Sequence, residues 1–389
     1  METNEREFEK TGGKKSKSVV VLAICVACLL VVNIGLVVFQ VITATAAQKA
    51  DKKVSQFIDD ERERQAKELE GEAYQEDGFS VGGQYEIKST TAISDAYKSN
   101  DNSQLNEQEV ETLKLASDVI KEVVKDNMSD YEKEVAVYDW MCKNISTSEG
   151  GSISVPGVNT TEAVSTPYGV LTGKQAVCVG YATTFRLLMN MLGIDCHIVH
   201  NDYHSWDLVQ IGEHWYHVDI YSDSSSGNYA NFNMSDSMAR NGHEWNDKGA
   251  LPVADSYEYC YAYQNAVETK DINTIPKTVY SATYGVRENA AFYFNIGAFD
   301  ATKSQRVSIM AEIMNQVFES GMDDNLSGKY IDCSLINVDE NTTIVCYSLT
   351  DSRAGEGGEG EMSYDEIYQE MLELINKTFK IDFAGGYSG

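Results

Sequence analysis

Apolar and polar residues follow several different periods along this chain, and each period predicts a different kind of element. Near the start, residues 19–42 form an apolar run that no charged residue interrupts. A run of this length is sufficient to cross a bilayer as a helix. The charged residues 47–73, which contain no proline, then predict a helical stalk, and the Gly-, Ser-, Asp- and Asn-rich residues 74–104 predict a linker. Stalk and linker together occupy residues 43–104.

The flanks of the apolar run predict its orientation. Four lysines precede it and three follow it closely, and this mild bias favours residues 1–18 in the cytoplasm and the remainder of the chain outside. We therefore expect a single-pass protein of the cell membrane whose folded part lies outside. A cleaved signal peptide is the alternative, with residues 44–46 as the cleavage site, but signal peptides have apolar regions of only about 7–15 residues.

Helical periodicity begins near residue 105. Two segments have the form of a capping box and precede apolar residues at helical spacing, namely "NEQE" at 106–109 and "SDYE" at 129–132. A third helical stripe follows Cys178, and three short β-like runs come after it at residues 196–200, 205–211 and 214–220. Helices followed by strands predict the α+β class, and we place this first compact domain at residues 105–262.

A second compact domain, of unknown function, is predicted at residues 277–382. Two runs in it, "TVYSATYGV" and "AFYFNIGAF", predict strands, and residues 330–349 predict a hairpin. Helical stripes are formed by Val307, Met310, Met314 and Val317 and, after "SYDE", by Ile367, Met371, Leu374 and Phe379. This mixture predicts a small C-terminal α+β domain, to which we assign no chemistry.

The hairpin of the second domain contains a cysteine in each strand. A two-residue turn at Asp339–Glu340 would place Cys333 directly opposite Cys346. We expect either a disulfide between them or two free thiols in contact, and the sequence leaves both open.

The charge of the chain excludes one class of partner. The formal net charge is −29 and the pI is about 4.5. Because nucleic-acid binding needs a Lys/Arg footprint, we expect no nucleic acid among the partners. Six cysteines lie outside the apolar run, which is too few for a disulfide scaffold of this length.

Cys178 is the first candidate for chemistry. Tyr181, Phe185, Leu188 and Leu192 follow it on one side of the predicted helix, so its side chain points inward from the first turn. The unpaired amides and the dipole at a helix N-terminus lower the pKa of a thiol. Taken alone, the segment favours a cysteine that is merely buried.

A base and its orienting carboxylate are predicted in the hairpin that follows. His204 and Asp219 are equidistant from a turn at Ile211–Gly212, and any even-residue loop leaves the two side chains on the same face. Such a carboxylate would fix the tautomer of the imidazole and stabilise its charged form. A Cys178–His204–Asp219 triad is therefore sterically plausible.

The remaining histidines are expected to do less. His217 shares the face of Asp219 and is a candidate neighbour of the site, and His243 in "NGHEW" is a candidate contact or a structural residue. His197, His200 and His214 are expected in or beside strands without chemistry. No HExxH occurs, and no CxxC pair lies outside the apolar run, so we expect no metal site.

Three motifs in this order resemble the bacterial transglutaminase-like superfamily: "YGVLTGKQAVCVGYATTFRLLMNMLGIDC", "HSWDLVQIGEHWYHVD" and "NFNMSDSMARNGHEW". The resemblance covers residues 105–262. It implies a papain-like fold in which Cys178 is the nucleophile, His204 the general base and acid, and Asp219 the residue that orients the imidazole. The chain departs from the family pattern at Asp207, where the family often has Asn, and at Tyr221, where it often has Thr.

The resemblance implies a cysteine enzyme that acts on amide bonds through a thioester on Cys178. The apolar run at residues 19–42 adds the expectation that this enzyme is membrane-anchored and extracytoplasmic. An amine acceptor would mean protein-glutamine crosslinking, water would mean peptidase or amidase activity, and the sequence does not choose. We expect a protein or peptide substrate of the cell envelope and no cofactor. The Cys178 amide is the expected oxyanion donor, with Gln175 and Tyr168 as candidates for the second. The alternative is a catalytically inactive surface module that binds cell-envelope polymers or proteins.

Overall fold

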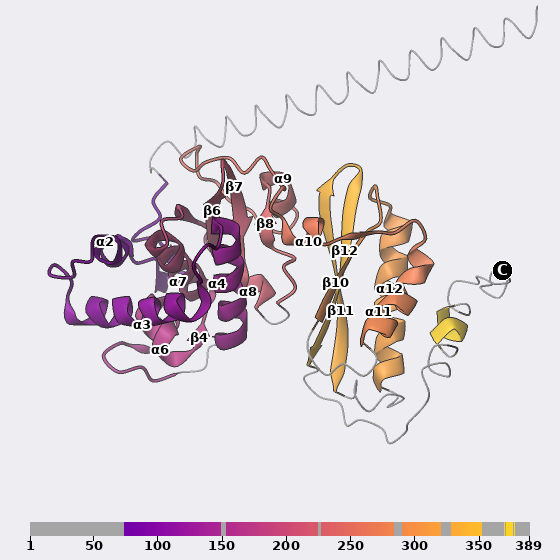
Figure 1. The fold of residues 1–389 in the computed structure, drawn as a ribbon, viewed down its shortest axis with the longest axis horizontal. Coiled ribbons are helices and arrows are strands. Elements are labelled where there is room, and N and C mark those ends of the chain that lie inside the picture. The colour runs from indigo at the N-terminus through magenta and orange to yellow at the C-terminus, as the bar shows by residue number, and fades with distance from the viewer. Residues whose placement is uncertain are drawn as a thin grey trace, which may run out of the picture. The chain divides into compact units, whose positions relative to one another are not determined.

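The computed structural model describes residues 74–148, 153–224, 227–283, 290–319, 328–351, 369, 371–375 and 377 (Figure 1). All of them belong to one compact unit, Tyr74–Gly389. Its first part is a group of helices against a four-stranded sheet, and its last part is a second four-stranded sheet with its own helices.

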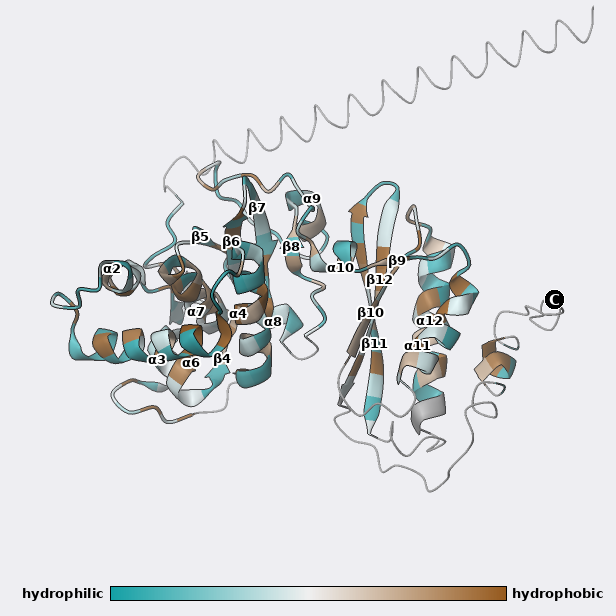
Figure 2. Ribbon diagram, viewed as in Figure 1, coloured by the Kyte–Doolittle hydropathy of each residue, from teal (hydrophilic) through white to brown (hydrophobic). Residues whose placement is uncertain are grey.

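The helices of the first part pack around a central one, α7, which spans Cys178–Met191. The others are α2 (Thr91–Ser99), α3 (Glu107–Val123), α4 (Asp130–Asn144), α5 (Thr160–Ser165) and α6 (Pro167–Gly173). All residues of α7 except Asn190 are buried, and the helix is brown along most of its length in Figure 2. A helix that is buried on all sides belongs in the interior, and its one charged residue, Arg186, is paired with Glu76 and Asp77. Cys178 therefore begins the most enclosed helix of this group.

Both predicted capping boxes are present. Asn106 and Ser129 accept hydrogen bonds from the amides of Glu109 and Glu132, whose carboxylates bond back to the cap amides. A third box, which the sequence analysis did not predict, starts α5 at Asn159. These reciprocal bonds satisfy amides that a helix start otherwise leaves unpaired.

Close packing of α7 on α5 depends on one glycine. A Cβ at Gly180 would lie 2.1 Å from the carbonyl oxygen of Val164 and 2.8 Å from Cγ2 of Val170. The absence of a side chain therefore sets how closely the first turn of α7, with Cys178, approaches its neighbours.

The sheet beside α7 is antiparallel, in the order β5-β6-β7-β8. Its strands are β5 (Cys196–His200), β6 (Ser205–Ile211), β7 (His214–Val218) and β8 (Phe232–Met234). Short helices α8 (Ile220–Asp223), α9 (Asp236–Ala239) and α10 (Tyr261–Gln264) follow the last two strands. The turn between β6 and β7 is Gly212–Glu213, one residue later than predicted, and Ile211 pairs with His214.

Residues 74–104 differ from the predicted linker. They contain a hairpin of β1 (Ser80–Val81) and β2 (Tyr85–Glu86), followed by α2. Gly82 and Gly83 adopt positive φ in the turn, so the glycines that suggested a linker form a tight turn instead. Val81 and Ile87 are buried in the same apolar cluster as Cys178. The segment between α4 and α7 contains α5, α6 and a parallel pair of strands, β3 (Ser146–Thr147) and β4 (Gln175–Ala176).

The C-terminal sheet has the order β11-β12-β10-β9 and combines antiparallel pairs with one parallel pair, β9 and β10. Its strands are β9 (Val267–Glu268), β10 (Ala290–Asn295), β11 (Lys329–Asp339) and β12 (Thr342–Asp351), and its helices are η1 (Ile272–Thr274), α11 (Ile275–Thr283) and α12 (Ala301–Glu319). The second predicted strand run, the hairpin and the helix bearing Val307 are confirmed. Of the predicted last helix, residues 371–375 are helical, and its start lies outside the described residues.

The first strand run predicted in this domain is wrong. Residues 278–283 of "TVYSATYGV" belong to α11. The helix buries Ile275, Val279, Tyr280 and Thr283, which is helical spacing. Burial of this face outweighs the strand preference of its β-branched and aromatic residues.

The predicted opposition of Cys333 and Cys346 is also wrong. Cys333 pairs with Tyr347, and Cys346 pairs with Ser334. A register shift between Asn337 and Asp339 moves the strands by one residue, and neighbouring residues of a strand point to opposite faces. Both cysteines are free, and they contribute to two different apolar clusters.

The predicted fold class and cell-membrane location need correction. Within the described ranges, no helix is both long enough and apolar enough to cross a membrane. The apolar helix α7 has 14 residues, whereas α12 has 19 residues but includes charged ones such as Lys303, Arg306 and Glu312. The predicted span 19–42 lies outside the described residues. The described part of the chain is a mixed α/β arrangement, and the transmembrane helix in the predicted fold class is not supported by it.

Candidate active site

The Cys178 thiol lies at the N-terminus of α7, where only 9% of the residue is exposed. Burial opposes ionisation of the thiol, but the interaction with His204, through hydrogen bonding and charge, outweighs it and lowers the pKa of Cys178. The amides of the first helical turn add positive potential at the same point. The site therefore favours a thiolate.

His204 lies between Cys178 and Asp219, directly before β6. Its Nε2 lies 2.8 Å from Oδ2 of Asp219, which leaves the other ring nitrogen, Nδ1, for the interaction with the Cys178 thiol. Burial would lower the pKa of His204, but hydrogen bonds and ion pairing with Asp219 and Cys178 raise it to about 10. The imidazole is thus held as an imidazolium between two anionic partners.

Asp219 is the most enclosed of the three residues, at 1% exposure. It is the N-cap of α8, where Ser222 donates from its amide to Oδ1 (3.1 Å) and from its hydroxyl to Oδ2 (2.6 Å). Burial would raise the pKa of Asp219, but hydrogen bonds from His204 and His243 hold it below its usual range. The carboxylate is therefore ionised and fixed in orientation.

The hairpin brings His204 and Asp219 to one face, although not directly opposite each other. With Ile211 paired to His214, the register continues to Asp219 opposite Trp206, so His204 is its diagonal neighbour. The shift from the predicted register is two residues, which preserves the face. Long side chains reach diagonal neighbours, and the imidazole spans the gap.

Similarity to known proteins covers these three residues. Residues 117–220 match the family model described as the transglutaminase-like superfamily, and this range contains Cys178, His204 and Asp219. The chain carries a transglutaminase-like domain.

One solved structure, described as "Crystal structure of a TGase", is similar at 19% sequence identity and a TM-score of 0.25. The similarity covers 32% of this chain and 35% of that chain. No curated protein sequence matches.

Asp207, where the transglutaminase-like pattern often has Asn, is buried in β6 at 2% exposure. Burial raises the pKa of Asp207 well above its usual range, and Sγ of Cys196 lies 3.6 Å from its Oδ1. A protonated carboxyl carries no charge, as an asparagine amide carries none. Tyr221, the other departure, lies against the ring of His204, with centroids 5.7 Å apart.

Four other histidines of the transglutaminase-like domain lie in strands. His217 accepts a hydrogen bond from Nε1 of Trp206 and bonds to Asp236, and burial lowers its pKa. The rest have partners away from the triad: His197 bonds to Glu76, His200 to the carbonyl of Gln75, and His214 to Asp255. His217 thus holds Trp206, which stacks on His204.

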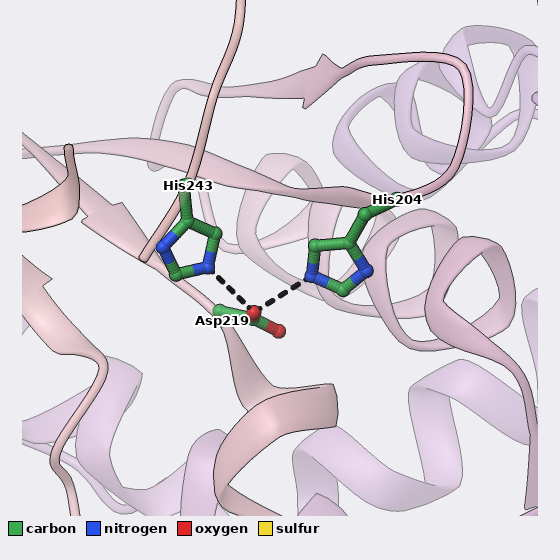
Figure 3. A group of neighbouring side chains, drawn as sticks. All are labelled: His204, Asp219 and His243. Atoms are coloured by element: carbon green, nitrogen blue, oxygen red, sulfur yellow. Dashed lines mark hydrogen bonds and ion pairs between the residues drawn. The ribbon is translucent and has the colours of Figure 1, made fainter. Parts of the chain in front are cut away.

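His243 makes the contact that sequence reasoning left open. Its Nε2 lies 2.8 Å from Oδ2 of Asp219, the same oxygen that faces His204. Figure 3 shows the two imidazoles approaching this oxygen from different sides. The only sequence signal was its place in "NGHEW", within the third motif of the resemblance.

His204, Asp219 and His243 also offer ligand atoms that lie within 4.8 Å of one another, a spacing that suits a metal ion. The two nitrogens are each 2.8 Å from Oδ2 of Asp219, whereas neighbouring ligands of a tetrahedral zinc ion lie about 3.3 Å apart. The Ser222 hydroxyl donates to the same oxygen. These distances are those of hydrogen bonds, and we treat the group as a hydrogen-bonded cluster.

Proposed function

We propose that the transglutaminase-like domain is a cysteine enzyme that transfers or hydrolyses acyl groups of amides through a thioester on Cys178. The observation that carries this proposal is the position of His204, which bonds to the buried Asp219 carboxylate and interacts with the Cys178 thiol, whose pKa it lowers. A thiolate paired with an imidazolium is both the nucleophile and the proton donor that amide cleavage needs.

In the first step the Cys178 thiolate attacks the amide carbonyl carbon, and the electron pair of the C=O bond moves to oxygen. The Cys178 amide, at the start of α7, is the proposed first donor to this oxyanion. As the tetrahedral intermediate collapses, His204 gives its Nδ1 proton to the leaving nitrogen. The products are a thioester on Cys178, a neutral His204 and a free amine or ammonia.

In the second step the neutral His204 removes a proton from the acceptor, which attacks the thioester carbonyl. The C–S bond breaks, and the thiolate–imidazolium pair forms again. Asp219 keeps the proton of Nε2 in place and stabilises the imidazolium in both steps. An amine acceptor yields a crosslink and water yields a carboxylate, and we propose a protein or peptide as the acyl donor.

Labelling with a thiol-directed acyl probe at pH 7 tests the proposal. We expect Cys178 to be labelled in the intact chain and labelling to vanish in Cys178→Ala. Cys260 is a matched control, because it is buried, precedes α10 as N-cap and has its pKa raised by burial to about 11. Cys260→Ala should label like the wild type.

An intact chain that resists labelling at Cys178, or labelling that persists in Cys178→Ala, would contradict the proposal. The first outcome would favour the inactive binding module, in which the triad is retained without reactivity. Labelled protein that transfers its acyl group to a lysine amine, to glycine ethyl ester or to water then identifies the acceptor by the mass of the product.

A further inference from the structure

The second histidine on Asp219 has no part in the steps above, and its surroundings are unusual for an imidazole. His243 is 8% exposed, and both of its ring nitrogens face oxygen acceptors. Nδ1 lies 3.2 Å from the carbonyl oxygen of Ala239, and Nε2 lies 2.8 Å from the carboxylate of Asp219.

The protonation of His243 follows from these two partners. A backbone carbonyl and an ionised carboxylate only accept hydrogen bonds. A neutral imidazole has one N–H, so one of its nitrogens would turn a lone pair toward an oxygen. Only the imidazolium satisfies both contacts, and burial makes an unsatisfied contact costly.

Charge balance at the triad points the same way. With Cys178 as thiolate, His204 as imidazolium and Asp219 as carboxylate, the three residues carry one net negative charge in a buried place. A second imidazolium at His243 brings the total to zero. The titratable groups facing His243 are Asp219 and His204, with His217 on β7, and Arg240 stacks on Trp245 in its own loop.

We infer that His243 is a positioning residue of the active site, an imidazolium that holds the Asp219 carboxylate toward His204 and neutralises the cluster. The catalytic part of this inference rests on the proposed function. The charge state of His243 is independent of that function. Its hydrogen bond to the triad is made to Asp219, so it acts on the reacting atoms through that carboxylate. Trp206 packs against its ring, with centroids 4.7 Å apart, and keeps it in place.

The first test is the protonation state of His243 in the full-length wild type. Long-range proton–nitrogen correlation spectra of 15N-histidine-labelled protein distinguish an imidazolium from either neutral tautomer. His243→Gln and His204→Gln assign the signals. We expect both His243 and His204 as imidazolium at pH 7.5, and a neutral His243 would overturn the inference.

The second test is the pH profile of Cys178 alkylation by iodoacetamide in His243→Gln. The glutamine amide still donates to Asp219 but carries no charge. Removing a cation beside the pair makes the thiolate harder to form, so we expect the alkylation midpoint to rise by about one pH unit. The acyl-transfer rate should fall about tenfold or more, as expected for a lost charge-assisted bond.

His200→Gln is the matched control. His200 is 7% exposed, packs against Tyr74 and Phe79 and bonds to a backbone carbonyl, so it shares the burial of His243 without its contact to Asp219. A profile of His243→Gln that coincides with that of His200→Gln and the wild type would overturn the inference. A wild type whose thiol titrates near the ordinary value of 9.0 would instead contradict the proposed function.

Discussion

Two hairpins of this molecule carry residues whose faces matter, and they differ by one residue of register. In the hairpin of β6 and β7, the strands pair without a shift, and the diagonal neighbours His204 and Asp219 meet at 2.8 Å. In the hairpin of β11 and β12, a register shift near Val338 separates the turn from the strands. Cys333 and Cys346 consequently lie on opposite faces of the sheet.

The difference shows that the side chains of a hairpin meet when the register places them on the same face of the sheet. Whether the register shifts by an odd or an even number of residues decides this, rather than closeness in sequence. Both turns lie one residue later than the symmetric positions first expected, at Gly212–Glu213 and Glu340–Asn341. Such a displacement moves the register by two and preserves every face. The bulge takes back one residue and reverses the faces.

The largest expected effect comes from breaking the contact of the first hairpin. Asp219→Asn keeps the shape of the side chain but removes the charge that holds His204 as imidazolium, so acyl transfer should fall about 1,000- to 10,000-fold. The measurement is the rate of thioester formation with an acyl probe. Asp207→Asn is its control in the same hairpin, because Asp207 is already held uncharged. Equal losses in both variants would contradict the role of Asp219.

The second hairpin can be made to form the contact that its bulge prevents. Ser334→Cys places a thiol directly opposite Cys346, so we expect a disulfide between these two positions on oxidation, and about 2–3 kcal/mol of added stability. Peptide mapping of the non-reduced protein identifies the bridge. Unfolding by urea with and without reductant measures its effect. A bridge between Cys333 and Cys346 in the unaltered protein would refute the register.

His204, which precedes the first hairpin, and its partner Cys178 both have shifted pKa values, and these shifts make the stability of the protein depend on pH. The raised pKa of His204, about 10 against 6.5, contributes stability that is complete below pH 6.5 and is lost as pH rises toward 10. The lowered pKa of Cys178 contributes stability that is present above 9.0 and is lost as pH falls through the folded value. Between pH 6.5 and 9.0, and above the folded pKa of Cys178, the folded and the unfolded pair each bind one proton, so their contribution is constant there.

Cys178→Ala removes this compensation and leaves His204 alone. Its unfolding free energy should therefore decline between pH 6.5 and 8.5 relative to the wild type, by up to about 1.4 kcal/mol per pH unit. Urea titrations at the two pH values measure the difference, and Cys346→Ala should show no such decline. Parallel curves for the wild type and Cys178→Ala would show that the thiolate–imidazolium pair does not form.

The smallest effect concerns the turn that sets the regular register. Gly212 has a φ of +64°, and Glu213 is not among the described residues with positive φ, a combination that fits a type II′ turn. A Cβ at Gly212 would make only an ordinary contact with its surroundings. The cost of Gly212→Ala therefore comes from backbone strain at positive φ, and we expect about 1 kcal/mol. Glu213→Ala should be nearly neutral. Comparable losses in both variants, measured by urea unfolding, would argue against this turn.

Local patterns accounted for a large share of the first domain. The capping boxes at Asn106 and Ser129 and the stripe after Cys178 each depend on residues three or four apart, and all are confirmed. Local signals failed where tertiary burial decided between alternatives. Residues 278–283 form a helix despite their strand propensity because the C-terminal sheet covers the face they bury.

The same distinction between local patterns and tertiary contacts applies to the candidate site. Alternation along one hairpin was enough to place His204 and Asp219 on a common face, because parity survives a turn that moves by one residue. Cys178 could be assigned to the first turn of a helix, but its contact with His204 joins separate elements.

Only the tertiary structure placed His243 on Asp219 and opposed Ser334 to Cys346. The contact of His243 depends on the path of a loop after α9, and the pairing of Cys346 depends on one bulged residue. Neither leaves a periodic signal in the chain. Periodic elements follow from short-range sterics and hydrogen bonding, whereas contacts between elements depend on packing that many distant residues determine together.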